Sequence, residues 1–199
     1  MIGVIDSKIC NIYSLSNMLK KIGADYRVIT SGDQFDGIDK IIMPGVGAFP
    51  KAMANLTIAG FKDRIKNSAE QGVPILGICL GMQILFEKSD EFGSTPGLGL
   101  IPGWVRKINT DRILPHMGWN SIYINNHSII VEGIDENSDV YFVHSYMADT
   151  DSKFVTAYTE YGEKIPAVVN RGNVYGTQFH PEKSQRWGEI IMRNFCFKV

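Results

Sequence analysis

Residues 75–83 read I-L-G-I-C-L-G-M-Q, so Cys79 lies between two glycines. The apolar run at 73–76 is typical of a short buried strand, and a helix-like sequence follows the cysteine. A strand, a Gly-x-Cys-x-Gly turn and a helix together form the cysteine version of a nucleophile elbow. Cysteine is also among the most buried residue types, so a structural cysteine at a tight turn explains this stretch equally well. Other residues of the chain are needed to distinguish a nucleophile from a structural cysteine.

The elbow interpretation makes physical demands on the neighbours of Cys79. A sharp strand-to-helix turn strains the backbone of the nucleophile, and Gly77 and Gly81 remove side chains that would clash there. The sulfur would lie above the carboxyl edge of a sheet, at the N-terminus of a helix whose dipole favours a thiolate. The next backbone N–H, that of Leu80, could donate to a developing oxyanion.

The first half of the sequence alternates strand and helix patterns. Apolar residues at helical spacing predict helices at residues 11–22 and about 57–70. Short apolar runs predict strands at residues 2–6, 26–30, 40–43 and 73–76. This alternation indicates a parallel sheet with right-handed crossovers.

The second half contains strand patterns joined by short, turn-rich connections, followed by a final helix that Ser184 is placed to cap. The predicted strands are 104–108, 119–124, 140–146, 154–159, 167–170 and 174–179. We therefore expect one α/β domain over residues 1–199. It would have a mostly parallel, flavodoxin-like central sheet with flanking helices and an antiparallel extension in the C-terminal half.

Composition excludes several classes of function. The chain has 199 residues, 44% of them hydrophobic, and a formal net charge of −1 from 20 basic and 21 acidic side chains. No basic run points to nucleic acid or an anionic membrane, no apolar stretch approaches a membrane span, and the first residues do not resemble a secretion signal. Three cysteines (Cys10, Cys79 and Cys196) cannot all pair within the chain. We expect a reduced, cytoplasmic protein.

His180 is the best candidate for a catalytic base. The strand pattern at 174–179 leads into Q-F-H-P-E-K-S, which places His180 at a strand end, where α/β sites gather. Glu182 follows two residues later, and residues i and i+2 of extended backbone point to the same side. Cys79, His180 and Glu182 could thus act as nucleophile, base and orienting acid. Taken alone, His-Pro-Glu is more often a strand-end histidine beside a solvated carboxylate.

The other histidines are weaker candidates. His144, in V-Y-F-V-H-S-Y, lies within a strand pattern, where a packed and hydrogen-bonded ring is expected. His116 falls in the turn-like L-P-H-M-G-W-N and His127 follows a turn, and neither has an acid spaced as Glu182 is from His180. No Cys-x-x-Cys and no i, i+4 histidine pair is present, so we expect neither a metal site nor a cofactor.

A glycine-containing turn also follows the strand pattern at 40–43. In P-G-V-G-A-F, residues 44–49, Gly45 and Gly47 lie on either side of Val46. Glycines allow a peptide to turn its N–H toward a ligand, so this loop could supply oxyanion donors opposite Cys79. An ordinary loop between a strand and a helix has the same composition, and two glycines at this spacing are no dinucleotide fingerprint.

Taken together, G-I-C-L-G-M-Q, H-P-E and the glycine loop resemble the motifs of the triad-type (class I) glutamine amidotransferases. The segments P-H-M-G-W-N, Y-F-V-H-S-Y and T-Q-F-H-P-E-K-S narrow the resemblance to glutaminase subunits of a synthase in histidine biosynthesis, and it covers essentially the whole chain. The resemblance implies that Cys79 attacks the side-chain amide of L-glutamine. His180 would protonate the leaving ammonia, and a thioester would be hydrolysed to glutamate.

The resemblance also assigns roles to further residues. It implies oxyanion donors at Leu80 and in the loop Gly45, Val46 and Gly47, and a heterodimer partner, a (β/α)8-barrel cyclase subunit, that receives the ammonia. The residues implied to hold the α-amino and α-carboxylate groups of glutamine are Gln83, Glu91, Ser145 and Tyr146. The partner interface would include residues 47–51 and His116, Met117, Trp119 and Asn120. Without the resemblance, Glu91 is only a charge on a solvated helix end, and Trp119 fits a core position equally well.

One segment departs from the family pattern. After the first strand the family commonly has a tyrosine–glycine pair and another glycine, whereas this chain has D-S-K-I-C-N, with Ser7, Ile9 and Cys10 at those positions and Asn11 kept. Alternatives therefore stay open: a paralogue that supplies ammonia for amidation of a bacterial surface sugar, a stand-alone γ-glutamyl hydrolase, or a catalytically silent subunit. Cys10 itself is interpreted as a turn or packing residue.

Overall fold

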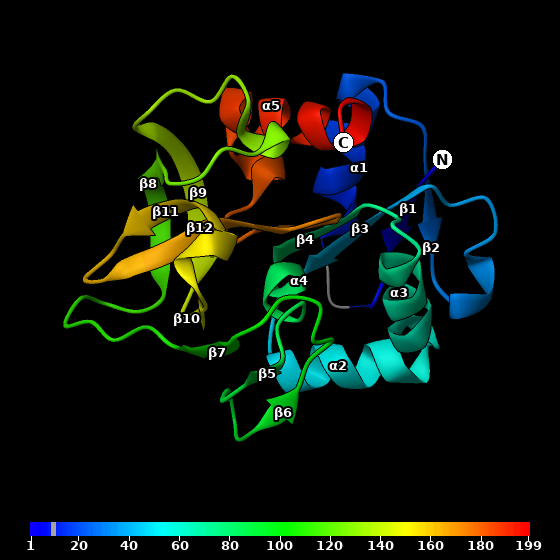
Figure 1. Ribbon diagram of the computed structural model, residues 1–199, viewed down its shortest axis with the longest axis horizontal. Helices are drawn as coiled ribbons and strands as arrows, with labels where there is room; N and C mark the ends of the chain where they lie inside the picture. The colour runs from blue at the N-terminus through cyan, green and yellow to red at the C-terminus, as the bar shows by residue number, and fades with distance from the viewer. Residues whose placement is uncertain (9–10) are drawn as a thin grey trace.

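The computed structural model describes residues 1–8 and 11–199, so Ile9 and Cys10 lie outside the described residues. A nine-stranded sheet forms its centre (Figure 1). In spatial order its strands are β2 (Tyr26–Ile29), β1 (Ile2–Ile5), β3 (Lys40–Gly45), β4 (Ile75–Cys79), β13 (Val174–Thr177), β12 (Lys164–Arg171), β11 (Val155–Glu160), β8 (His116–Ile124) and β9 (Ser138–His144). The strands from β2 to β13 pair in parallel, and those from β13 to β9 pair antiparallel. The predicted α/β fold with a parallel core and an antiparallel extension is confirmed.

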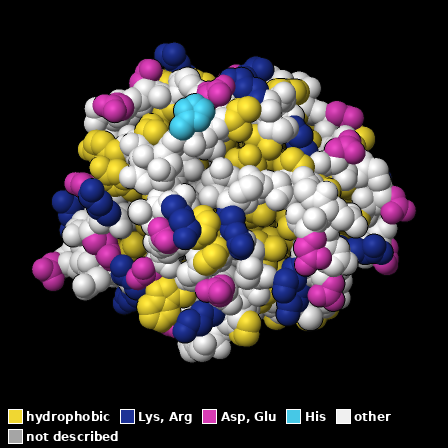
Figure 2. All heavy atoms as spheres, viewed as in Figure 1, with side chains coloured by type: hydrophobic (Ala, Val, Ile, Leu, Met, Phe, Trp, Pro, Cys, Tyr) yellow, Lys and Arg dark blue, Asp and Glu magenta, His cyan; other side chains and the backbone are white. Residues whose placement is uncertain are grey.

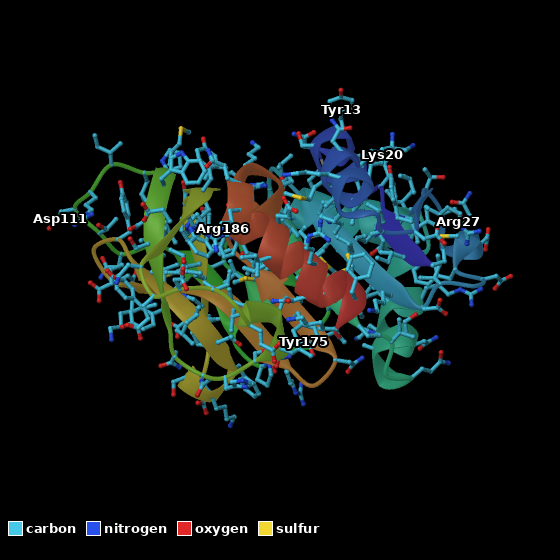
Figure 3. All side chains as sticks on the ribbon, turned by 90° about the horizontal axis from the view of Figure 1, so that it is seen from above. Tyr13, Lys20, Arg27, Asp111, Tyr175 and Arg186 are labelled. Carbon is cyan, nitrogen blue, oxygen red and sulfur yellow. The ribbon has the colours of Figure 1, made fainter. Side chains whose placement is uncertain are left out.

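Helices cover both faces of the parallel part of the sheet (Figure 1). On one face lie α1 (Ile12–Ile22) and α5 (Gln185–Phe197), which Figure 3 shows side by side from above. On the other lie α2 (Phe49–Ile58) and α3 (Phe61–Glu70). Each layer has its own apolar core, built around residues such as Leu19 and Phe195 on the first face and Leu56 and Phe61 on the second. Short 3-10 helices span Gly32–Gln34, Ile129–Val131, Ser152–Phe154 and Pro181–Lys183.

The helix expected at 11–22 is confirmed, and its ends follow from its sequence. Asn11 is its N-cap and accepts a hydrogen bond from the Ser14 N–H, while Gly23 ends it with a left-handed φ of 76°. Leu15 and Leu19 are buried against the sheet, whereas Tyr13 points into solvent (Figure 3).

A second, four-stranded sheet contains β10 (Tyr146–Asp149), β7 (Trp104–Lys107), β5 (Lys88–Ser89) and β6 (Thr95–Pro96). The single strand predicted at 140–146 is therefore wrong. The chain leaves the large sheet at His144 and enters the small one at Tyr146, with Ser145 between them. The turn expected around His116 is also wrong, because His116 begins β8 and pairs with His144 of β9.

The helix predicted at about 57–70 is confirmed as α3, although it begins only at Phe61. The preceding helix, α2, was not predicted, and Gly60 separates the two with a left-handed φ of 72°. α2 begins directly after the glycine loop, with Pro50 in its first turn. Proline at a helix start and the buried spacing of Phe49, Ala52, Met53 and Leu56 are signals that reveal this helix.

The helix after Cys79 is shorter than the elbow pattern predicts. α4 spans only Leu80–Gln83, so few peptide dipoles are aligned behind the sulfur and the helix dipole contributes little to a thiolate. Ser184 lies at the N-cap of α5 as expected, but its side chain makes no cap hydrogen bond. Its Oγ instead donates to the His180 carbonyl oxygen at 2.7 Å and accepts from the Tyr141 N–H at 3.0 Å.

Close backbone packing explains the two glycines around Cys79. A Cβ on Gly77 would overlap the Gly81 carbonyl, and a Cβ on Gly81 would overlap the Met43 carbonyl oxygen in β3. These are contacts with backbone atoms that cannot rotate away, so only glycine fits. The crowding predicted from the Gly-x-Cys-x-Gly spacing is confirmed.

The surface carries charges of both signs. On the face shown in Figure 2, basic and acidic side chains are interspersed and no large patch has a single sign. Among the described residues, no helix combines the length and the apolar character that crossing a bilayer requires.

The packing at Gly81 gives a stability prediction. We expect Gly81→Ala to lower the free energy of unfolding by about 3 kcal/mol or more, because its methyl group has no space against Met43. Gly37→Ala is the control, since Gly37 has a positive φ of 72° and open space around it, so only backbone strain of about 1 kcal/mol is expected. Urea denaturation measures both. Equal losses in the two variants would contradict the packing argument.

Candidate active site

Cys79 ends β4 and is the N-cap residue of α4. Its φ of 55° and ψ of −110° are unusual for a residue with a Cβ, and such strain clusters at functional sites. The side chain is almost fully buried, and its Sγ lies 3.9 Å from the Val143 carbonyl oxygen of β9. The strained elbow expected from the sequence is present.

Parallel strand pairing brings the other predicted segments to the same sheet edge. β4 lies between β3 and β13, and Gly45 at the end of β3 is paired with Cys79. On the other side β13 ends at Thr177, and His180 follows shortly after. The backbone N–H of His180 donates to the Tyr141 carbonyl oxygen at 3.0 Å, which fixes the segment beyond the strand. Nucleophile, glycine loop and histidine therefore meet at one place.

His180 and Glu182 form a buried pair. Nδ1 of His180 donates to Oε1 of Glu182 at 2.8 Å, and the two side chains are 3% and 5% exposed. Burial lowers the pKa of His180, but Cys79 and Glu182 together raise it to about 10, because both favour the imidazolium. Nε2 of His180 has no hydrogen-bond partner among the described residues. That nitrogen is available for a proton transfer.

A cavity of about 400 Å³ opens beside Cys79 and His180. It brings together most of the predicted site: its lining comprises Val46, Gly47, Cys79, Leu80, Gln83, Glu91, Ser145, Tyr146 and His180, with Pro115, Val143 and His144 in addition. Gly45 is adjacent at the end of β3, and Glu182 lies behind His180. The size of the cavity suits a small metabolite.

Sequence reasoning missed one buried side chain next to the sulfur. Gln178 has no exposed surface, and its Nε2 lies 3.8 Å from Cys79 Sγ. Its Oε1 accepts from Gln83 Nε2 at 3.0 Å. The sequence shows only that Gln178 lies two residues before His180, because residues 178 and 179 form a bend after β13 and the strand period does not apply there.

Glu91 is not the solvated helix-end charge that its local sequence suggested. It follows β5, is 9% exposed, and its Oε2 accepts from the Phe49 N–H at 2.7 Å. Phe49 is the first residue of α2, so the carboxylate lies at a helix N-terminus, where negative charge is stabilised. This contact ties the glycine loop to the cavity wall.

His144 is packed and hydrogen-bonded, as expected. Its Nδ1 donates to the Tyr146 carbonyl oxygen at 2.8 Å, and its Nε2 lies 3.0 Å from His116 Nδ1. Burial is the main cause that lowers the pKa of His144 to about 3 and that of His116 to about 4. Both rings are neutral at pH 7, unlike His180.

The residues expected at a partner interface fall into two groups. Met117 and Trp119 alternate along β8 with exposed fractions of 61% and 49%. His116 is buried, and the Nδ2 of Asn120 donates to the Glu160 carbonyl oxygen at 3.0 Å. Of these four β8 residues, only Met117 and Trp119 therefore present large side chains to solvent.

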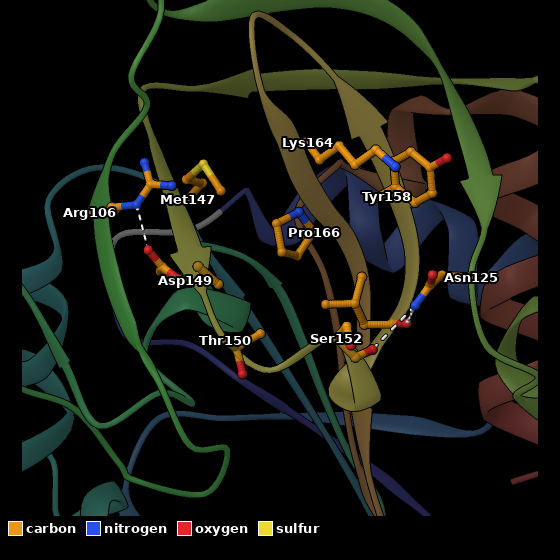
Figure 4. Close-up of a pocket in the computed structure, with 11 residues that line it drawn as sticks. Arg106, Asn125, Met147, Asp149, Thr150, Ser152, Tyr158, Lys164 and Pro166 are labelled. Atoms are coloured by element: carbon orange, nitrogen blue, oxygen red, sulfur yellow. Dashed lines mark hydrogen bonds and ion pairs between the residues drawn. The ribbon is translucent and has the colours of Figure 1, made fainter.

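A second cavity, of about 320 Å³, is a weaker candidate for a functional site (Figure 4). Several of its polar groups already have partners in the protein. Arg106 is paired with Asp149, and the Asn125 amide donates to the Ser152 and Val155 carbonyl oxygens. Among its described lining residues there is no cysteine and no histidine.

The remaining cysteines give no second nucleophile within the described residues. Cys196 is buried, and burial raises the pKa of its thiol to about 12. Cys10 lies outside the described residues. Among residues 1–8 and 11–199, no group of three or more histidine, cysteine or carboxylate side chains is placed to hold a metal ion.

A strained cysteine elbow, a buried histidine–glutamate pair and a glycine loop at one sheet edge define a class of enzyme. A family model described as "Glutamine amidotransferase class-I" matches residues 3–199, and the chain belongs to this family. The sequence-based assignment to the family is confirmed.

The chain is also similar to individual named proteins. The chain is 45% identical over 195 residues to "Imidazole glycerol phosphate synthase subunit HisH" of Bacillus cereus (strain B4264), covering 98% of this chain and 93% of the relative. It is 46% identical over 198 residues to the protein of the same name from Bacillus thuringiensis (strain Al Hakam). Among solved structures, PurLQS from Thermotoga maritima matches with a TM-score of 0.79 at 19% identity, covering 98% of this chain and 96% of that one. That likeness shows the fold.

The two neutral histidines predict how stability depends on pH. Their folded-state pKa values of about 4 and about 3 lie below the ordinary 6.5, so the unfolded chain binds more protons as the pH falls. We expect the free energy of unfolding to fall between about pH 6.5 and pH 4, by up to about 1.4 kcal/mol per pH unit for each ring. His116→Gln should reduce this slope in urea denaturation. The exposed His127 provides the control, and an equal reduction in His127→Gln would contradict the assignment.

Proposed function

We propose that this protein is the glutaminase subunit of an imidazole glycerol phosphate synthase, which hydrolyses L-glutamine and supplies ammonia for histidine biosynthesis. The observation that carries the proposal is the meeting of Cys79, His180 and Glu182 at one buried edge, beside a cavity that fits an amino acid. The near full-length similarity to relatives named as subunits of that synthase supports the choice of pathway.

The reaction starts at the Cys79 sulfur. The thiolate attacks the side-chain amide carbon of glutamine, and the negative charge moves to the amide oxygen. Backbone N–H groups of Leu80 and of the loop at Gly45, Val46 and Gly47 stabilise this oxyanion. Gly47 has a φ of 96°, a conformation that glycine adopts without strain, so the loop peptides are free to turn their N–H groups toward the cavity.

His180 moves the protons. Its Nε2–H protonates the amide nitrogen, the carbon–nitrogen bond breaks, and ammonia leaves with a thioester on Cys79. The neutral imidazole then takes a proton from water, which attacks the thioester and releases glutamate and the thiolate. Glu182 holds the ring through Nδ1 and stabilises its positive charge.

The cavity wall supplies substrate contacts. Both N–H groups of the Gln83 amide are used by Tyr146 and Gln178, so the Oε1 of Gln83 is left to accept from the α-ammonium group of glutamine. Glu91, Ser145 and Tyr146 complete the pocket around the α-amino and α-carboxylate groups.

The partner in this proposal is a (β/α)8-barrel cyclase subunit that receives ammonia in a cytoplasmic heterodimer. Residues 1–199 form one glutaminase domain, and the partner docks over the exposed part of β8 at Met117 and Trp119 and over residues 47–51. The departure at residues 7–10 keeps a paralogous surface-sugar amidation complex as the second candidate. Association with a histidine-pathway barrel subunit discriminates between them.

Loss of the nucleophile should separate the two halves of the reaction. We expect Cys79→Ala to abolish glutamine-dependent synthesis by the complex, while synthesis from added ammonium salt survives, because the barrel chemistry is untouched. Cys196→Ala is the control, a buried cysteine outside the cavity. Cys79 is not the nucleophile if glutamine-dependent synthesis persists in Cys79→Ala. Strong hydrolysis of γ-glutamyl peptides without a partner would instead favour a stand-alone hydrolase.

Removal of the exposed β8 indole should weaken the complex. We expect Trp119→Ala to raise the Kd for the barrel subunit about tenfold or more, measured by calorimetry, since buried tryptophans dominate interfaces. Trp104, which is 36% exposed on the small sheet, gives the matched variant Trp104→Ala with little expected change. An equal effect of both variants would place the interface elsewhere.

A further inference from the structure

The mechanism above gives no role to Gln178, although this fully buried carboxamide lies against the nucleophile. Its orientation is determined by its neighbours. Gln83 Nε2 donates to the Tyr146 carbonyl oxygen at 2.9 Å, which fixes the nitrogen end of Gln83. The same nitrogen donates to Gln178 Oε1 at 3.0 Å, so the nitrogen of Gln178 must point to Cys79 Sγ, 3.8 Å away.

A second arm of hydrogen bonds ends at the same Tyr146 carbonyl oxygen. His144 Nδ1 donates to this oxygen at 2.8 Å, and His144 Nε2 lies 3.0 Å from His116 Nδ1. His116 Nε2 lies 3.2 Å from Asn120 Nδ2, which also donates to the Glu160 carbonyl oxygen. A continuous network therefore runs from Asn120 on β8 to the sulfur.

This arm permits only one arrangement of protons. A carbonyl oxygen cannot donate, so His144 carries its proton on Nδ1 and, being neutral, accepts at Nε2. An amide nitrogen cannot accept, so His116 accepts from Asn120 at Nε2 and carries its proton on Nδ1. His116 then donates to His144. Each hydrogen bond of this arm has one donor and one acceptor. Their direction is determined by the Asn120 amide at one end and the Tyr146 carbonyl at the other.

We propose that Gln178 is a positioning residue for Cys79, held with its N–H against the sulfur by the network that runs from Asn120 to Gln83. A hydrogen bond to sulfur is stronger for the thiolate than for the thiol, so this donor favours the reactive form. A longer helix would stabilise the thiolate through its dipole. Because α4 has a single turn, the Gln178 N–H supplies part of that stabilisation. The inference rests on the proposed role of Cys79 as nucleophile.

Alkylation of Cys79 tests this role without glutamine or a partner. We expect Gln178→Leu and Gln178→Met to slow the reaction of Cys79 with iodoacetamide at pH 7 about tenfold, followed peptide by peptide in a mass spectrometer. In the complex, kcat for glutamine should fall while KM stays close to that of the unchanged protein. Two variants are used so that the test survives if one of them misfolds. Circular dichroism shows whether each variant is folded.

Asn194→Leu is the matched control. Asn194 is an equally buried carboxamide, bonded to the Ile130 and Glu132 carbonyl oxygens outside the network, and its loss should lower stability without slowing alkylation. Unchanged alkylation rates in both folded Gln178 variants would overturn the proposal. If the unchanged protein alkylates faster than the variants but hydrolyses no glutamine with any partner, the proposed function is at fault instead.

The proton arrangement has its own spectroscopic test. Long-range proton–nitrogen correlation at pH 7 should show His116 and His144 as neutral rings with the proton on Nδ1. Asn120→Asp should place a proton on Nε2 of His116, because a carboxylate only accepts. Asn125→Asp, at an amide outside the network, should leave both rings unchanged. An Nε2–H tautomer in either ring of the unchanged protein would overturn the network.

Discussion

The contact between the Gly81 backbone and the Met43 carbonyl in β3 is the constraint on which the rest of the site depends. The turn after β4 approaches its neighbour so closely that no Cβ fits at either glycine of the elbow. This approach turns Cys79 into its strained conformation and aims the sulfur over the sheet edge. Strain of about 1–3 kcal/mol is tolerable there because β4 is held by parallel partners on both sides.

Three buried histidines surround the site, and their neighbours give them opposite properties. The pKa of His180 rises in spite of burial, because Cys79 and the Glu182 carboxylate on Nδ1 both favour the imidazolium. His144 and His116 face a carbonyl, an amide and each other, so burial wins and their pKa values fall. Cys79 and Glu182 together thus distinguish His180 from the two neutral rings. His180 is therefore protonated at neutral pH, whereas His144 and His116 are neutral.

The features that could be predicted from sequence depend on neighbouring residues. The elbow was recognisable because its Gly-x-Cys-x-Gly spacing is local, although Met43 of β3 supplies the crowding at Gly81. His180 and Glu182 meet as predicted, but Glu182 lies in the 3-10 helix Pro181–Lys183 and not in the extended backbone from which the pairing was inferred. The length of α4 could not be predicted. The carbonyl oxygens of residues 84–86 accept from N–H groups of residues 98–101 instead of continuing the helix.

The break at Ser145 likewise depends on β10 pairing with β7, far away in the chain. The burial of Glu91 depends on a helix start at Phe49 that was not foreseen. Each of these misses involves a partner that local pattern cannot specify, whereas the overall order of parallel and antiparallel strands followed from the alternation of patterns and was confirmed.

The place of β13 in the sheet has a consequence for biosynthesis. This strand comes near the end of the chain, yet it inserts between β4 and β12 in the middle of the sheet and delivers both Gln178 and His180 to the sulfur. The ribosome therefore makes Cys79 long before it makes Gln178 and His180. In the proposed mechanism the nascent chain carries a cysteine without its catalytic neighbours, and the site is complete only when β13 takes its place in the sheet.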